Sequence, residues 1–331
     1  MKNIHLVKTG NIRPTILFFK SKGIPVEKLM ALSKLPMSVF NANDDEPMPV
    51  HAFWHFVQLC GDANKEDDLG FQLVSEQGMA VIQKIADKAI AEAITLHDAI
   101  AILVKFISSY STHAKYWLDS KDDGIWFTGG KVEINDLDFH LMEQIALSNL
   151  ICFVRHYLGT NWQPKAIRLQ QSKNLTVTKR NYPKSLVATN QDVTAIFIDN
   201  GELGTSHPEL LSLYDDLELL KSNSFQQKLY LAIKPYFGEG LPSLQQLAEI
   251  LGLSLRQIQR RLSKEGVTFR HVLHKLSFDI AKEQLIHSDK KIIDIAADLG
   301  YSDKSHFNRA FHQWSGMAPS AYRAQMMQES K

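Results

Sequence analysis

The stretch LAEILGLSLRQIQRRL, residues 247–262, is followed later in the chain by a second stretch of the same plan, IAADLGYSDKSHFNRAF, residues 295–311. In each, apolar residues at spacings of three and four lead to a glycine, then to a serine, and then to a second apolar pair. Spacings of three and four place an apolar stripe on one side of a short helix. Each stretch therefore predicts a helix, a turn and a second helix.

The glycine and the serine mark the turn. Gly252 and Gly300 suit the left-handed conformation that ends a helix, and Ser254 and Ser302 are expected to accept hydrogen bonds from the first amides of the next helix. The two copies differ by one residue, since Gly252 to Leu262 is ten positions and Gly300 to Phe311 is eleven. The second turn is expected to be longer. Both stretches predict helix-turn-helix units.

The second helix of each unit carries side chains of the types that contact DNA bases and phosphates. Arginine can donate two parallel hydrogen bonds to guanine, glutamine and asparagine can pair with adenine, and an exposed helix fits the major groove. Between residues 254 and 275 there are six Lys or Arg and one acid, Glu265. The predicted DNA-binding residues are Arg256, Gln257, Gln259, Arg260 and Lys264 in the first unit and Lys304, Ser305, His306, Asn308 and Arg309 in the second.

The segment from Thr268 to Ser288 predicts one helix between the two units, with Phe269, Val272, Leu273, Leu276 and Ile280 facing inward. About 20 residues of helix span about 30 Å, close to the 34 Å of one DNA turn. A rigid spacer of this length would let both recognition helices enter successive major grooves on one side of the duplex.

Residues 244–323 resemble the DNA-binding domain of the AraC-type transcription regulators. The resemblance rests on residues 295–311 and on the residues that follow them, Trp314, Gly316, Pro319, Tyr322 and Arg323. One departure is Ser277, where the family pattern implies an arginine after Leu276. The resemblance implies a regulator that binds promoter DNA, contacts RNA polymerase as an activator can, and forms a homodimer.

Charge is distributed unevenly along the 331 residues. The whole chain has a net charge of +1, but residues 225–331 hold 15 Lys or Arg against 10 Asp or Glu, and residues 1–224 hold 22 against 26. A basic C-terminal third is expected if only that part meets nucleic acid.

The sequence contains neither a membrane-spanning run nor a good signal peptide, so a cytosolic protein is expected. Cys60 and Cys152 lie in apolar helical contexts, so no disulfide is expected.

The preceding part predicts an α+β domain. Helices are expected at Pro49–Cys60, Leu69–Glu76, Val81–Ala89, Leu96–Tyr110 (capped by Thr95) and Leu137–Leu158, a hairpin from Ala114–Leu118 and Gly124–Thr128, and strands at Ala166–Gln170 and Ala195–Ile198. This order is similar to the N-terminal ligand-sensing domain of the arabinose-binding-like AraC-type subgroup, with Ile94–Ala99 as the cue. The resemblance implies a small-molecule effector that it does not name.

The predicted organisation is a sensing or dimerisation domain at 1–210, a linker at 211–224 and an all-α DNA-binding domain at 225–331, whose two helix-turn-helix units are joined by a linker helix. An alternative is an architectural or constitutive DNA-binding protein whose N-terminal domain only dimerises.

Other residue patterns give weaker hypotheses. No nucleophile elbow, phosphate loop, dinucleotide fingerprint or cluster of metal ligands occurs at the required spacing, so an enzyme, a cofactor and a metal are not expected. His51 and His55 have metal-ligand spacing, but two ligands make an incomplete site and helix packing is preferred. Four tryptophans could line a ligand pocket, although a core role is preferred for Trp54, Trp117, Trp126 and Trp162.

Overall fold

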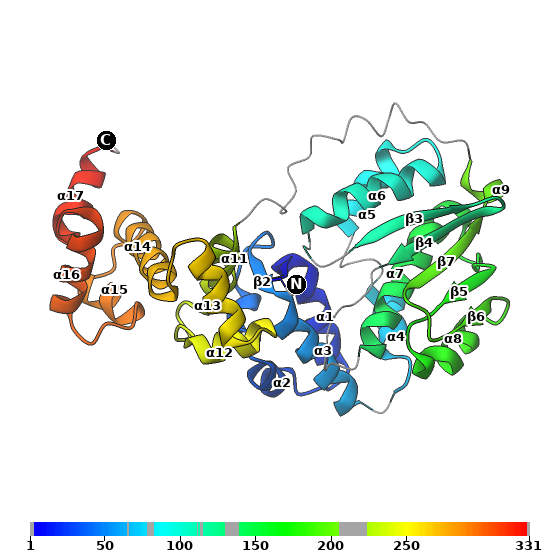
Figure 1. Ribbon diagram of the computed structural model, residues 1–331, viewed down its shortest axis with the longest axis horizontal. Coiled ribbons are helices and arrows are strands. Elements are labelled where there is room, and N and C mark those ends of the chain that lie inside the picture. Colours follow the sequence, from blue (N-terminus) through cyan, green and yellow to red (C-terminus); the bar gives the residue numbers. More distant parts are fainter. Residues whose placement is uncertain are drawn as a thin grey trace. The chain divides into compact units, whose positions relative to one another are not determined.

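The computed structural model describes residues 3–64, 66–77, 83–110, 112, 115–129, 139–204 and 224–329. The chain divides into two compact units. The N-terminal unit comprises His5–Leu35 and Val39–Ser222, and the C-terminal unit comprises Asn223–Lys331 together with Met1–Ile4 and Pro36–Ser38. Figure 1 shows helices and a sheet in the first and helices in the second. The expected α+β region followed by an all-α region is confirmed.

The first part of the N-terminal unit is helical. β1 (Leu6–Lys8) pairs antiparallel with β2 (Pro47–Pro49), and neither strand was predicted from the sequence. Between residues 9 and 110 the helices of the chain are α1 (Thr9–Ser21), α2 (Val26–Ser33), the 3-10 helix η1 (Met37–Phe40), α3 (Val50–Ala63), α4 (Leu69–Gln77), α5 (Gln83–Glu92) and α6 (Leu96–Tyr110). The Thr95 hydroxyl accepts from the backbone N–H of Asp98, as its expected role as the cap of α6 requires.

A five-stranded sheet follows, in the order β3-β4-β7-β5-β6. The predicted hairpin is present, with a two-residue turn at Asp122 and Asp123. Its first strand begins at Tyr116; Lys115, which was expected in the strand, is not part of it, and Ala114 lies outside the described residues. The β5–β6 pair is parallel and the other pairs are antiparallel. The strands are β3 (Tyr116–Lys121), β4 (Gly124–Gly129), β5 (Ala166–Arg168), β6 (Leu186–Ala188) and β7 (Thr194–Asp199).

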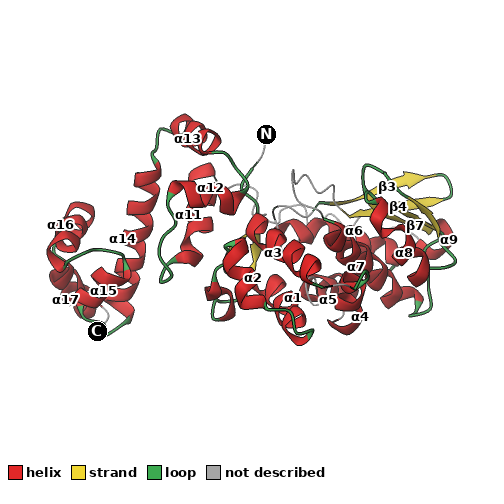
Figure 2. Cartoon of the chain, turned by 90° about the horizontal axis from the view of Figure 1, so that it is seen from below, coloured by secondary structure: helices red, strands yellow, loops and turns green. Residues whose placement is uncertain are grey.

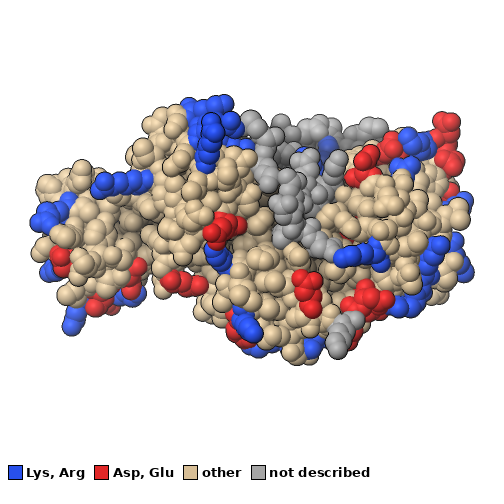
Figure 3. Space-filling view, turned by 60° about the horizontal axis from the view of Figure 1, so that its bottom comes forward, with Lys and Arg blue, Asp and Glu red and all other residues tan. Residues whose placement is uncertain are grey.

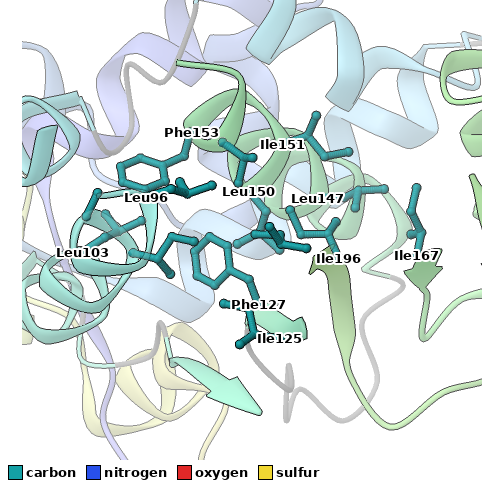
Figure 4. Close-up of a cluster of buried hydrophobic side chains, with 14 of the residues drawn as sticks. Leu96, Leu103, Ile125, Phe127, Leu147, Leu150, Ile151, Phe153, Ile167 and Ile196 are labelled. Atoms are coloured by element: carbon teal, nitrogen blue, oxygen red, sulfur yellow. The ribbon is translucent and has the colours of Figure 1, made fainter. Parts of the chain in front are cut away.

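The core of this unit lies between the sheet and the long helix α7 (His140–Leu158), which packs against β4 and β7 (Figure 1). Alternation along β4 points Ile125 and Phe127 toward Leu150 of α7 and Leu103 of α6 (Figure 4). The short helices η2 (Ser172–Asn174), α8 (Leu175–Asn181) and α9 (Asn200–Leu203) complete the unit's described elements.

Trp126 lies on the other face of β4, with the Arg168 guanidinium 3.8 Å above its ring and Phe197 at 5.3 Å. Of the other tryptophans in the pocket hypothesis, Trp54 is buried in α3, as the preferred core role requires, and Trp162 packs against the core and donates its indole N–H to Glu202. Trp117 is partly exposed on β3. Two of the four therefore have the core role and Trp117 does not.

A buried carboxylate joins α7 to the sheet. Glu143 accepts hydrogen bonds from the Thr194 hydroxyl, the Asn174 amide and the backbone N–H groups of Gln170 and Gln171. Burial raises the pKa of the Glu143 carboxyl, and these four donors act in the opposite direction. This arrangement was not predicted, because its partners are 27 to 51 residues away from Glu143 in the sequence.

The described elements of the C-terminal unit are helical (Figure 2). Within the described residues of the whole chain, no helix is both long enough and apolar enough to cross a bilayer. The unit's elements are α11 (Phe225–Ile233), the 3-10 helix η4 (Lys234–Tyr236), α12 (Leu244–Leu251), α13 (Leu255–Lys264), α14 (Phe269–His287), α15 (Ile292–Asp298), α16 (Lys304–Ser315) and α17 (Pro319–Glu329).

Candidate nucleic-acid interface

The first helix-turn-helix unit, α12 and α13, has the turn that its sequence predicts. Gly252 has φ +60°, in the left-handed region, and directly follows α12. Ser254 caps α13: its hydroxyl accepts from the backbone N–H of Gln257, and the Gln257 side chain accepts from the backbone N–H of Ser254. This reciprocal capping box fixes where the recognition helix begins.

The second unit, α15 and α16, differs in its cap. Gly300 has φ +77°, but the cap of α16 is Asp303, whose carboxylate accepts from the backbone N–H of His306 at 2.8 Å. The expectation that Ser302 caps this helix is wrong, because the turn holds one more residue between the glycine and the cap. The predicted longer second turn is confirmed.

Counted from their caps, the two recognition helices match position by position. Gln259 and Asn308 are each the fifth residue after the cap, and Arg260 and Arg309 are each the sixth. The one-residue difference between the two stretches therefore lies entirely in the turn. Both helices carry a carboxamide and an arginine at the same place.

The apolar side chains of both units form the predicted core. Leu247, Leu251, Ile258 and Leu262 are buried in the first, and Ile295, Phe307 and Phe311 in the second. Phe311 contacts the rings of Phe278, Phe307, Trp314 and Tyr322, with centroid distances of 5.4 to 6.4 Å. These contacts hold α16 against α14 and α17.

The linker helix α14 has the predicted bounds, with Thr268 as its cap and Ser288 after its end. Its 19 residues span about 28 Å, and Figure 2 shows it extending from α13 to α15–α17. Arg323 of α17 donates to the carbonyl oxygens of Leu285 and Ser288 at 3.0 and 3.4 Å, at the C-terminal end of α14 where a positive charge is favourable. Arg323 thus attaches the C-terminal end of the linker helix to α17.

The predicted reading face of α13 is exposed. Arg256, Gln259, Arg260 and Lys264 are exposed, whereas Ile258 and Leu262 are buried, and Lys and Arg side chains gather over α13 in Figure 3. Gln257 is half-buried, and its side-chain oxygen is used in the capping box. Its amide N–H₂ group remains the part that can donate to a base.

On α16 the predicted residues have more varied surroundings. Lys304, Ser305 and Arg309 are exposed. His306 is exposed too, but its Nδ1 lies 3.4 Å from the Ser302 hydroxyl and 3.5 Å from the Asp303 carboxylate. Asn308 is half-buried and its Oδ1 is fully covered without a hydrogen-bond partner among the described residues. The side-chain oxygen of Asn308 therefore faces the interior in this structure and is not presented to a base edge.

A comparison with protein families matches residues 247–325 to a family described as a helix-turn-helix domain. Residues 247–325 form an AraC-family helix-turn-helix domain. The match includes both units and the linker helix and extends into α17.

Curated relatives of this AraC-family domain are transcription regulators by name. The chain is 39% identical over 82 residues to the ornithine utilization regulator of Pseudomonas aeruginosa, covering 25% of this chain and 24% of that one. It is 32% identical over 81 residues to the transcriptional activator NphR of a Rhodococcus species, covering 24% of each. These alignments span about a quarter of the length of either relative.

Among solved structures, the chain is similar to the transcriptional regulator CdpR from Pseudomonas aeruginosa, with 18% identity and a TM-score of 0.38, over 92% of this chain and 98% of that one. The C-terminal domain of AraT from Geobacillus stearothermophilus is 26% identical with a TM-score of 0.29, over 32% of this chain and 88% of that one.

Two charged residues of the AraC-family domain have roles that the sequence did not indicate. Arg261 lies among the basic residues of α13 but is buried, with its guanidinium 5.1 Å from the Phe225 ring and burial lowering its pKa. Glu265, the single acid of the basic stretch, accepts from the backbone N–H groups of Phe225 and Gln226. Both residues attach α11 to the first unit, and their partner helix is about 40 residues distant in the sequence.

Proposed function

We propose that the protein is a sequence-specific DNA-binding transcription regulator. The observation that carries the proposal is the pair of capped recognition helices, α13 and α16, which carry an arginine at the same position and are joined by one helix of 19 residues. That helix is about 28 Å long, close to the 34 Å between successive major grooves on one side of a duplex. Double-stranded promoter DNA is the expected partner.

The proposed contacts divide into two kinds. Arg256, Gln259 and Arg260 of α13 and Arg309 of α16 would approach base edges, where arginine pairs with guanine and glutamine with adenine. The remaining members of the predicted set would contact the phosphate backbone or orient the helices. This second group contains Gln257, Lys264, Lys304, Ser305, His306 and Asn308.

The N-terminal unit is proposed to sense a small-molecule effector and to mediate a homodimer, in the manner of the arabinose-binding-like subgroup. Its support is the separate core around α7 and the five-stranded sheet, which gives the chain a second folded body in addition to the DNA-binding one. Effector binding would change dimerisation or the relation between the units, so that the regulator engages its promoter and contacts RNA polymerase in the cytosol. A constitutive binder that only dimerises is the alternative.

The deciding experiment is selection of bound duplexes from a random DNA pool by the full chain. Repeated rounds should enrich a motif with two parts separated by about one helical turn. An Arg260→Ala, Arg309→Ala double variant should fail to enrich it, while an Asp289→Asn variant, changed at an exposed position in the loop after α14, should behave as the unsubstituted chain does. Failure of the unsubstituted chain to enrich any sequence would overturn the proposal. A change in melting temperature with a small molecule would separate an effector sensor from a constitutive binder.

A further inference from the structure

Leu255, the first residue of α13, is an apolar side chain on the surface of the recognition helix. It is 36% exposed, whereas Ile258 and Leu262 of the same helix are 0% and 2% exposed. Leu255 lies three and seven residues before Ile258 and Leu262, so it stands at the edge of the apolar stripe of α13 and keeps 36% of its surface exposed there. This exposed apolar edge borders the basic surface of the recognition helix.

The position of Leu255 is fixed relative to the reading face. The capping box of Ser254 and Gln257 sets the first turn of α13, and the N-terminal residues of a recognition helix are those that contact base edges. Gln259 follows Leu255 by four residues, so the two side chains are neighbours along one side of the helix. Side chains on a helix tilt toward its N-terminus, which brings Gln259 over Leu255.

The matching position of the second unit is Lys304, the first residue of α16, which is also exposed. Both recognition helices thus present their first side chain to the surface, but with different chemistry. A lysine there can hold a phosphate, and a leucine cannot. The apolar feature that the major groove offers to a leucine is the 5-methyl group of thymine.

We propose that Leu255 packs against the 5-methyl group of a thymine, beside the base pair that Gln259 contacts. Glutamine suits adenine, whose partner is thymine, so one A·T pair or two adjacent ones would satisfy both side chains. Arg256 and Arg260, farther round the exposed surface of the helix, would approach the neighbouring base edges. The inference rests on the proposed function, because it needs α13 to enter the major groove.

The test uses the full chain and the duplex that the selection experiment enriches. Each thymine of the first half of that duplex is replaced in turn by deoxyuridine, which removes only the methyl group. At one position the affinity of the unsubstituted chain should fall about fourfold, the value for burying one methyl-sized apolar group. Leu255→Ala should bind the thymine and uracil duplexes equally at that position. Leu255→Lys, which copies the second unit, should also lose the distinction.

Ile293→Ala is the matched control, because Ile293 is an exposed apolar residue of the same domain that lies on α15. This variant should keep the fourfold preference for thymine. The inference is overturned if the unsubstituted chain binds thymine and uracil duplexes alike at every position, or if both Leu255 variants keep the preference. Either result would leave the proposed function intact, whereas failure to enrich any duplex would refute the proposed function itself.

Discussion

The Glu265 carboxylate accepts a hydrogen bond from the backbone N–H of Phe225, with 2.7 Å between Oε1 and the nitrogen. Its other oxygen accepts from Gln226 at 2.9 Å, and Ser224 accepts from Gln227 at 3.1 Å. The first three amides of α11, which have no partner within the helix, are thereby satisfied. An acidic residue at the end of a recognition helix thus attaches α11 instead of weakening a basic surface.

Glu265→Gln should destabilise the domain by about 1 to 2 kcal/mol, as loss of a helix cap does. The amide oxygen can still accept one N–H, but the negative charge that favours the helix N-terminus is gone. Urea unfolding of the full chain, followed by circular dichroism, measures the change. Asp289→Asn, at an exposed loop position, should have no effect. Equal stability of the Glu265 variant would mean that α11 does not depend on this contact.

Phe311→Ala should destabilise by about 3 to 5 kcal/mol, because it removes a buried aromatic ring. The side chain is 0% exposed and contacts four other aromatic rings of the second unit. Thermal unfolding is the measurement, and Met327→Ala, a change at a side chain of α17 that is 45% exposed, is the control. Unchanged melting of the Phe311 variant would show that the faces of α16 are assigned wrongly.

Asp303→Ala should lower the melting temperature at pH 7 by removing the cap of α16. The backbone hydrogen bond to His306 lowers the pKa of the Asp303 carboxyl below its ordinary value. A lowered pKa in the folded state means that the stabilisation is present above the unfolded pKa, near 3.9, and is lost as the pH falls through the folded one. The difference from the unsubstituted chain should therefore shrink below about pH 4.

Ser254→Ala is the comparison for that experiment, since Ser254 caps α13 with a hydroxyl that does not titrate. The Ser254→Ala variant should lose about 1 kcal/mol of stability, and this loss should not depend on the protonation of the Asp303 carboxyl. If the Asp303 difference persisted unchanged to pH 2, the charge would not contribute to the cap.

Local pattern made most of the C-terminal unit predictable. Apolar spacing, Gly252, Ser254 and Thr268 gave α12, α13 and α14 with bounds close to those observed, because each signal acts within one or two turns. The cap of α16 was assigned one residue too early, since Ser302 and Asp303 are both good caps and only the path of the turn decides between them. Arg261 was missed because its burial depends on α11, which the sequence places about 36 residues earlier.

The N-terminal unit was less predictable because more of its structure depends on contacts between residues that are distant in the sequence. The β3–β4 hairpin and α6 followed from alternation and from the Thr95 cap, whereas the three-residue strands β1, β2 and β6 exist through pairing with distant partners. The proposed base-reading residues lie on an exposed helix, where amphipathic pattern alone defines the face. Leu255 was passed over because a leucine in an amphipathic helix is usually assigned to the core.

A fragment from Ser224 to Lys331 should fold by itself and bind DNA more weakly than the full chain. Its core, from Leu247 to Phe311, is built from residues of this segment, and Ser224 supplies the cap of α11. Circular dichroism and a DNA shift assay at low salt are the measurements. The weaker binding is expected because the fragment would lose the second copy that a homodimer brings to the site. An unfolded fragment would contradict the proposed boundary at residues 211–224.

The last prediction concerns whether Arg260 contacts a base or a phosphate. Arg256, Gln259 and Arg260 are exposed on α13, whereas Ile258 and Leu262 are buried. A paired contact from Arg260 to guanine predicts that Arg260→Ala costs about 1 to 3 kcal/mol on the selected duplex and relaxes preference at a single base pair. A phosphate contact predicts an equal loss on all sequences and a salt slope lower by about one, because one fewer counterion is released.

Binding to a set of singly substituted duplexes at two salt concentrations decides between these contacts. Arg309→Ala is the matched variant, because Arg309 has the same position after the cap of α16 and should relax preference about one helical turn away from the Arg260 position. Lys264→Ala, at the C-terminal end of α13, should instead weaken all duplexes alike. If Arg260→Ala behaves as Lys264→Ala does, Arg260 holds the backbone, and specificity in the first unit rests on Arg256, Gln259 and Leu255.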